Sequence, residues 1–246
     1  MTVWNKLLGI ALALSTLPAP AQQLVGTKTA FPSDHHMITM ERFDPPHAGS
    51  HTAIVVIHGG GGPNPDWEKN GLLAALVAAG YSVFLPHYFD GAGQWKPNDN
   101  HQFLDYIRTL NDATRYISRQ PDVRDKGIGV VGISLGGYLA LGLSEEVRSH
   151  PPPIKSPDIK AVVEFYGGMP DFAIDRMTTM PPVLILHGEN DPYVSVNRAL
   201  ALDALLQKKS LPHEMKIYPH QGHSFDSDTQ KDANQRAVTF LESHLH

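Results

Sequence analysis

Two glycine patterns overlap around Ser134, in the segment GIGVVGISLGG at residues 127–137. The pattern G-x-S-x-G, centred on Ser134, is typical of a serine nucleophile held in a sharp turn between a strand and a helix. The pattern G-x-G-x-x-G indicates a dinucleotide site only where its glycines follow a strand and an acidic residue lies about 20 positions further on. Here Gly127 and Gly129 precede or begin the apolar run IGVV, and the later region reads SHPPPIK. The segment therefore favours a nucleophilic serine over a nucleotide cofactor.

A serine hydroxyl is a weak nucleophile, so it needs a neighbouring base, and that base needs an acid that orients it. In folds with this serine turn, the acid and then the histidine follow the serine along the chain. Asp191 lies in GENDPYV, directly after the apolar run PVLILH, and His223 lies in PHQGHSFD, directly after HEMKIY. The sequence therefore predicts a catalytic triad of Ser134, Asp191 and His223.

Other residues compete for the acid and base positions. Glu189 and Asp226 are nearby acids, and His220 shares a loop with His223. An aspartate in front of a helix is also a common helix cap, which is the simpler interpretation of Asp191. We favour Asp191 because its loop follows a buried strand, and His223 because the glycine beside it permits a tight turn.

A serine hydrolase also needs hydrogen-bond donors for the oxyanion of its tetrahedral intermediate. The amide of Leu135, which follows the serine at the start of a helix, is one candidate. The second candidate lies in the run HGGGG at residues 58–62, where amides without neighbouring Cβ atoms can approach a substrate closely. We expect the amide of Gly60 or Gly61 to supply it.

Apolar, β-branched runs alternate with helical patterns along the chain, which predicts parallel strands joined by helices. The expected strands are residues 37–43, 53–58, 81–86, 128–132, 160–166, 182–187 and 213–218. The expected helices are residues 70–80, 100–119, 135–148, 194–209 and 229–244. These elements predict a single-domain α/β fold, a doubly wound, mostly parallel sheet covered by helices on both faces, with no large lid. Ligand sites in such sheets lie at the carboxyl ends of the strands.

The N-terminus differs from the rest of the chain. Lys6 precedes an apolar run, and Ala19-Pro20-Ala21 follows it. This pattern predicts a secretory signal peptide at residues 1–21, followed by the catalytic domain at residues 22–246. The mature protein is expected in the periplasm or outside the cell, with no membrane span. A formal net charge of −5 argues against a nucleic-acid partner, and the chain has no cysteine, so it forms no disulfide.

Substrate contacts are less well marked in the sequence. Tyr88 and Trp95 follow an expected strand on the same edge as the serine and are candidates for the substrate pocket. Packing within the loop is an equal alternative for both. No histidine and acid spacing indicates a metal site. The sequence does not indicate an oligomeric state.

Four ordered motifs, HGGGG, VVGISLGGYLAL, VLILHGENDPYV and HQGHSFD, resemble the α/β-hydrolase superfamily and, within it, the dienelactone hydrolase family. The resemblance spans residues 35–245 and implies an α/β-hydrolase fold. One position departs from the pattern, because dienelactone hydrolases carry a cysteine where this chain has Ser134. The resemblance thus implies a serine carboxylic-ester hydrolase more than a dienelactone hydrolase.

The expected activity is hydrolysis of an ester, thioester or lactone of a small or medium substrate, without a cofactor. Two alternatives stay open. A peptidase of the prolyl-oligopeptidase type shares this catalytic domain but normally carries a large additional domain, which we do not expect here. A binding protein could retain the fold without catalysis, although such proteins usually lose a member of the triad.

Overall fold

The computed structural model describes residues 24–63, 70–97, 99–149, 159–174, 177 and 179–245. The signal peptide expected at residues 1–21 lies outside these residues. Among the helices described, none combines the length and the apolar character that crossing a bilayer requires.

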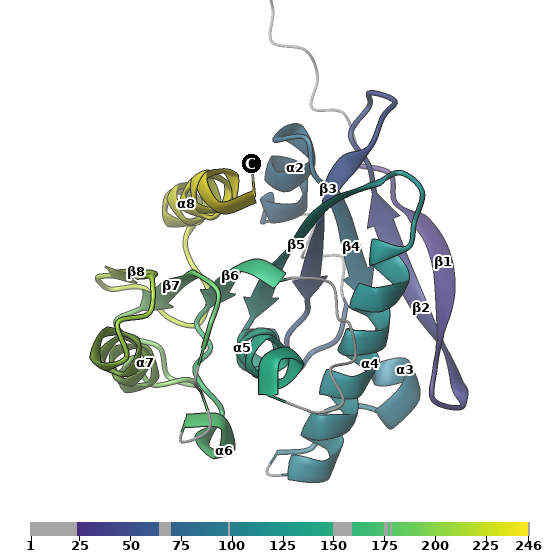
Figure 1. Cartoon of the computed structure of the whole chain (residues 1–246). Helices are drawn as coiled ribbons and strands as arrows, with labels where there is room; N and C mark the ends of the chain where they lie inside the picture. Colours follow the sequence, from purple (N-terminus) through teal and green to yellow (C-terminus); the bar gives the residue numbers. More distant parts are fainter. Residues whose placement is uncertain are drawn as a thin grey trace, which may run out of the picture.

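A single mixed sheet forms the centre of the described chain (Figure 1). Its strands are β1 (Thr27–Ser33), β2 (His36–Phe43), β3 (His51–Ile57), β4 (Ser82–Pro86), β5 (Val123–Ile133), β6 (Ile159–Phe165), β7 (Val183–Gly188) and β8 (His213–Tyr218). The eight strands lie in the order β1-β2-β4-β3-β5-β6-β7-β8. All neighbouring pairs from β4 to β8 are parallel, whereas β2 runs antiparallel to both β1 and β4. The predicted, mostly parallel α/β sheet is confirmed.

Helices cover both faces of the sheet (Figure 1). They are α2 (Leu72–Ala78), α3 (Phe89–Ala92), α4 (Asn100–Ser118), α5 (Leu135–Ser149), α6 (Asp171–Ile174), α7 (Asn197–Lys208) and α8 (Ser227–Leu245). Buried side chains of α4, α5 and α7 share one apolar core, and those of α2 and α8 share the other. The central strands lie between these two cores, which explains why β3 and β7 are apolar on both faces.

Strand β1 was not expected from the sequence. Its residues TKTAFPS are mostly exposed, and only Phe31 and Ser33 are buried, so the apolar signal is weak. Pro32 is compatible with this position because β1 is an edge strand, where a missing N–H need not break a ladder. The turn to β2 passes through Asp34 with a φ of 50°.

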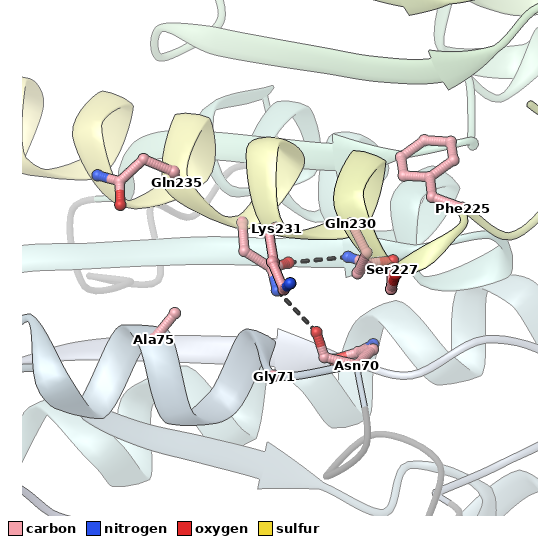
Figure 2. A pocket seen from close by; sticks show the side chains of 9 residues that line it. Asn70, Gly71, Ala75, Phe225, Ser227, Gln230, Lys231 and Gln235 are labelled. Carbon is pink, nitrogen blue, oxygen red and sulfur yellow. Dashed lines mark hydrogen bonds between the residues drawn. The ribbon is translucent and has the colours of Figure 1, made fainter. Parts of the chain in front are cut away.

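On the face of the sheet covered by α2 and α8, polar side chains connect these two helices. The Asn234 side chain donates to the carbonyl of Asn70 at 2.8 Å, and Gln230 donates to Asn234 at 2.8 Å. Asn70 and Gln230 line a groove of about 610 Å³, and Figure 2 shows Asn70 below α8 and Gln230 on α8. These bonds fix the start of α2 against α8 at the edge of the sheet where the strands end.

The loops after β3, β5, β7 and β8 leave the sheet at one edge, because these strands are parallel neighbours of a common sheet. These four loops contain the HGGGG run, the serine turn, Asp191 and His223. The sheet topology therefore gathers every predicted catalytic residue at one place.

Candidate active site

Ser134 occupies the sharp turn between β5 and α5. Its φ of 57° is left-handed, which is strained for a residue with a side chain. Its amide donates to the carbonyl of Phe165 at 2.9 Å, so β6 holds the turn from the side. A Cβ atom on Gly132 would collide with the backbone of Gly136, and one on Gly136 would collide with the carbonyl of Ile57. The glycines of the motif are thus required because three backbone segments cross here.

His223 links the serine to the acid. Its Nε2 lies 2.8 Å from Ser134 Oγ, and its Nδ1 lies 2.7 Å from Asp191 Oδ2. The imidazole packs against Tyr166 at 4.8 Å and Tyr193 at 5.4 Å between ring centroids. Tyr193 is 82% exposed, so the His223 ring lies at the protein surface between one buried and one exposed aromatic side chain.

The two carboxylate oxygens of Asp191 have different hydrogen-bond partners. Its Oδ1 accepts hydrogen bonds from the amides of Tyr193 at 2.8 Å and Val194 at 2.9 Å. Its Oδ2 faces His223 and is therefore free of the turn. Because this turn takes up the amides of residues 193 and 194, α7 begins only at Asn197, three residues later than expected. Asp191 is therefore not a helix cap, because α7 has Val196 as its N-cap with no side-chain cap hydrogen bond, and the carboxylate closes a local turn with Oδ1 while Oδ2 contacts His223.

A second histidine lies beside the acid. His187 Nε2 is 2.9 Å from the carbonyl of Val194 and 3.5 Å from Asp191 Oδ2. Burial lowers the pKa of His187, so its ring is neutral at neutral pH and donates to the carbonyl. His187 was not predicted as a site residue, and its only signal in the sequence is its place at the end of the apolar run PVLILH.

The competing acids, Glu189 and Asp226, and the competing histidine, His220, form other hydrogen bonds. His220 is exposed, and its amide donates to Glu189 Oε2 at 3.3 Å. Asp226 accepts from the amide of Thr229 at 2.9 Å, which caps the start of α8. Only Asp191, of these three acids, contacts the imidazole of His223 among the described residues.

The HGGGG loop approaches the serine through its first glycine. A Cβ on Gly59 would lie 3.3 Å from Ser134 Cβ, whereas one on Gly60 would contact Trp95 and one on Gly61 would contact nothing within 4 Å. The carbonyl of Gly59 accepts from the amide of Gly62 at 3.1 Å and lies 2.9 Å from His58 Nδ1. Of these three glycines, Gly59 is thus the one that approaches Ser134. Leu135, the other oxyanion candidate, is the first residue of α5.

Tyr88 supports this loop from behind. Its side chain is fully buried, its ring stacks on His58 at 4.1 Å, and its hydroxyl donates to the His58 carbonyl at 2.8 Å. This corrects the expectation that Tyr88 lines the substrate pocket, because its side chain is 0% exposed and packs between His58 and Tyr106. Burial lowers the pKa of His58 to about 4, so this ring is neutral as well. Trp95 is partly buried against the loop and remains a pocket candidate.

The part of the chain that the structure describes contains no group of three or more histidines and acids arranged to hold a metal ion. At the edge where the strands end, the structure brings together a hydroxyl, an imidazole and a carboxylate. This set of groups can transfer an acyl group through a covalent intermediate.

Comparison with known proteins identifies the family. A model described as "Dienelactone hydrolase family" matches residues 42–243. The chain is 27% identical over 249 residues to a carboxymethylenebutenolidase homolog of Xenopus tropicalis, covering 94% of each protein. It resembles the crystal structure of a dienelactone hydrolase from Anabaena variabilis ATCC 29413 with a TM-score of 0.72 and 18% identity, covering 92% of this chain and 100% of that chain. It also resembles a dienelactone hydrolase-like promiscuous phosphotriesterase, P91, from metagenomic libraries, with a TM-score of 0.73 and 15% identity, covering 91% and 100%.

The two solved structures establish the α/β-hydrolase fold, and the family match covers most of the chain. The chain belongs to the dienelactone hydrolase family of α/β hydrolases.

Proposed function

We propose that this protein is a serine hydrolase that cleaves a carboxylic ester, thioester or lactone through an acyl-enzyme intermediate. One observation carries the proposal: His223 lies within hydrogen-bond distance of Ser134 Oγ on one side and of Asp191 on the other, at 2.8 and 2.7 Å. A nucleophile, a base and an orienting acid in continuous contact are the arrangement that activates a serine.

In the proposed first half-reaction, Ser134 Oγ attacks the carbonyl carbon while its proton passes to His223 Nε2. The tetrahedral intermediate then collapses, and His223 returns the proton to the departing oxygen or sulfur. Asp191 keeps the proton of the imidazole on Nδ1, which leaves Nε2 free to accept, and stabilises the imidazolium that forms. In the second half, water attacks the acyl-enzyme, its proton passes through His223 to Ser134 Oγ, and the carboxylic acid is released.

For the oxyanion we propose the amides of Leu135 and Gly60. The Leu135 amide lies at the N-terminus of α5, where the helix dipole favours negative charge. For the second donor, Gly60 is preferred to Gly61. The carbonyl of Gly59 is turned toward His58 and the Gly62 amide, and in a trans peptide the N–H of the next residue points the opposite way.

Mutation of the serine, combined with active-site labelling, tests the proposal. Purified wild type should hydrolyse short-chain 4-nitrophenyl esters and react with a fluorophosphonate at Ser134. Ser134→Ala should lose both activities by about 10³-fold or more, since the nucleophile is absent. Ser144→Ala is the matched control: it removes a buried hydroxyl of α5, the helix that follows Ser134, and in the described chain this hydroxyl bonds only to the Ala140 carbonyl, at 2.7 Å. It should keep full activity.

The same preparation separates the alternatives. Hydrolysis that survives Ser134→Ala would contradict Ser134 as the nucleophile, and a wild type that neither reacts nor labels would favour the binding-protein alternative. A panel of blocked peptides alongside the esters tests the peptidase alternative, and preference for peptides would contradict the proposal.

We further propose that the protein is exported, with cleavage near Ala21. The basis is the N-terminal pattern of a cation, an apolar run and small residues. N-terminal sequencing of protein recovered from the periplasm or medium should begin close to residue 22, and an intact N-terminus in the cytoplasm would contradict export.

A further inference from the structure

Glu164, near the end of β6, carries a buried carboxyl group that the proposed reaction does not use. Its side chain is 0% exposed, its Oε2 accepts from the amide of Gly167 at 2.6 Å, and its Oε1 has no hydrogen-bond partner among the described residues. Burial raises the pKa of Glu164 to about 8, against the opposing effect of the Gly167 amide. The group is therefore a neutral carboxylic acid at pH 7. Perturbed, buried acids of this kind concentrate at functional sites, so its surroundings are informative.

The carboxyl group lies directly beneath the serine turn. In the sheet, Glu164 pairs with Gly132 of β5, and the next residue, Phe165, accepts the hydrogen bond from the Ser134 amide. A Cβ on Gly137, in the first turn of α5, would lie 3.3 Å from Glu164 Oε2. The backbones of Gly137 and Gly167 also approach each other closely, since a Cβ on Gly167 would lie 2.9 Å from Gly137 Cα. The Glu164 carboxyl group thus lies where the serine helix meets the loop after β6.

The same hydrogen bond holds the loop that packs against the base. Tyr166 precedes Gly167 and has a left-handed φ of 41°, a conformation that costs free energy for a residue with a side chain. Its amide donates to the carbonyl of Leu186 at 2.8 Å, and the next amide donates to Glu164. The Tyr166 ring is thereby directed onto His223, at 4.8 Å between centroids, and onto Phe225, at 5.3 Å.

We propose that Glu164 is a positioning residue for hydrolysis at Ser134: its carboxyl oxygen fixes the Tyr166 turn, and through it the His223 ring, relative to the serine helix. The inference rests on the function proposed above. Glu164 touches none of the three triad residues in the described structure, so its effect is expected on orientation and not on proton transfer. Small displacements of catalytic groups cost up to about 100-fold in rate.

Two substitutions of Glu164 distinguish the effect of its hydrogen bond to the Gly167 amide from the effect of its side-chain volume. Glu164→Gln keeps the acceptor for the Gly167 amide and, like the protonated acid, is neutral. Glu164→Leu keeps an apolar volume of similar size and removes the acceptor. At pH 7 we expect Glu164→Gln to retain kcat within about threefold, and Glu164→Leu to lose between about 10- and 100-fold in kcat with little change in KM.

The rate constant for labelling by a small fluorophosphonate gives a second readout. It reports how well His223 activates Ser134 and depends little on the substrate pocket. It should fall in Glu164→Leu by the same factor as kcat, while thermal unfolding monitored by circular dichroism shows whether the variant is folded. Should Glu164→Leu fail to fold, the pH comparison below tests the inference with Glu164→Gln alone.

The ratio of wild-type to Glu164→Gln activity should depend on pH. Among the described residues, Tyr138 on α5 is the titratable side chain that interacts with Glu164, and Tyr166 lies two positions away. Burial raises the pKa of Tyr138, and raises that of Tyr166 to about 12, so both stay neutral up to pH 9. The ratio should therefore be constant from pH 6 to 7 and fall as Glu164 ionises between pH 7.5 and 9, because a buried carboxylate whose Oε1 has no hydrogen-bond partner among the described residues is driven out of its place between Gly137 and Gly167.

The outcomes distinguish this inference from the proposed function. A wild type without hydrolase activity removes the function and the inference together. A wild type that depends on Ser134, with Glu164→Leu equally active and equally fast to label, overturns only the role of Glu164. Loss of activity in Glu164→Gln as large as in Glu164→Leu, or a ratio that stays flat to pH 9, also overturns it.

Discussion

The two sides of the site are held in place by different means. On the nucleophile side, the Ser134 turn is fixed by close backbone packing, in which Gly132 and Gly136 leave no room for a side chain. On the acid–base side, Asp191 and His223 are held by side-chain hydrogen bonds, and their loops are tied together by the Asn190 amide, which donates to the Gln221 carbonyl at 2.8 Å.

Because of this difference, substitutions on the two sides are expected to change different properties of the protein. On the nucleophile side, a larger side chain in place of a glycine collides with the backbone, so such a substitution is expected mainly to lower the free energy of unfolding. On the acid–base side a change of polarity disorients the imidazole while the fold remains. Gly188 is an exception on the second side, because a Cβ there would collide with the Gly222 carbonyl.

Among substitutions that compare the two sides, the largest effect on activity is expected from Asp191→Asn. The amide oxygen of asparagine can still accept the amides of Tyr193 and Val194, so the turn and the stability should be preserved. The side chain facing His223 no longer carries the charge that sets the tautomer, and kcat should fall by about 10³–10⁴-fold. Steady-state kinetics with a thermal unfolding curve tests this. Glu189→Gln changes the neighbouring acid in the same way and should leave kcat unaltered.

The next effect concerns added volume. Gly136→Ala places a methyl group against the carbonyls of Ile57 and His58 and should lower the free energy of unfolding by about 3 kcal/mol or more. Gly222→Ala places a methyl group 3.8 Å from its nearest neighbour, Pro192. It should change the free energy of unfolding by less than about 1 kcal/mol. Urea denaturation of both variants measures the difference. Similar values for the two would remove the proposed contrast between the sides.

A third prediction concerns the pH dependence of stability. The pKa of Glu164 is raised from 4.5 to about 8 in the folded protein, so the folded state binds one more proton than the unfolded chain between these values. The contribution of Glu164 to the free energy of unfolding should therefore be fully present below pH 4.5. It should fall by about 1.4 kcal/mol per pH unit as the pH rises from there, and it should be lost once the pH has passed the folded pKa.

Buried histidines act in the opposite direction at lower pH, since the pKa of His58 is lowered from 6.5 to about 4. The window from pH 6.5 to 8 isolates Glu164, and there the wild type should lose about 2 kcal/mol relative to Glu164→Gln. Urea titrations at several pH values check this, and parallel pH profiles for the two proteins would contradict it.

The smallest effect is expected from Tyr88→Phe. The substitution leaves the buried carbonyl of His58 without its donor and should cost about 1–2 kcal/mol of stability. Because this carbonyl anchors the start of the glycine loop, kcat should also fall a few-fold. Tyr106→Phe removes a comparable bond, to the Gly93 carbonyl at 2.7 Å, and should lower stability without lowering kcat. Equal kcat losses in both would argue against a specific role for the Tyr88 bond.

Much of the architecture was predictable because β3, β5 and β7 are apolar runs followed by glycine, serine or acidic loops. Parallel strands bring their carboxyl ends to one edge, so chain order alone was enough to predict that Ser134, Asp191 and His223 meet. The edge strand β1 was missed, since a strand exposed along most of its length has little apolar periodicity.

Other features depend on contacts that no local pattern encodes. The burial of Tyr88 follows from the stacking of its ring on His58, thirty positions away in the chain. The burial of Glu164 was unexpected because an acid in an apolar strand normally marks an exposed face. The approach of Gly59 to the serine depends on the relative heights of β3 and β5, which the register of the sheet sets.

Asp191 uses one oxygen to close its own turn and the other to hold His223, so a single carboxylate joins local folding to activity. A chain in which this turn has not formed has no carboxylate placed against the imidazole. Under the proposed mechanism, the recovery of turnover during refolding should therefore coincide with formation of the turn at residues 191–194.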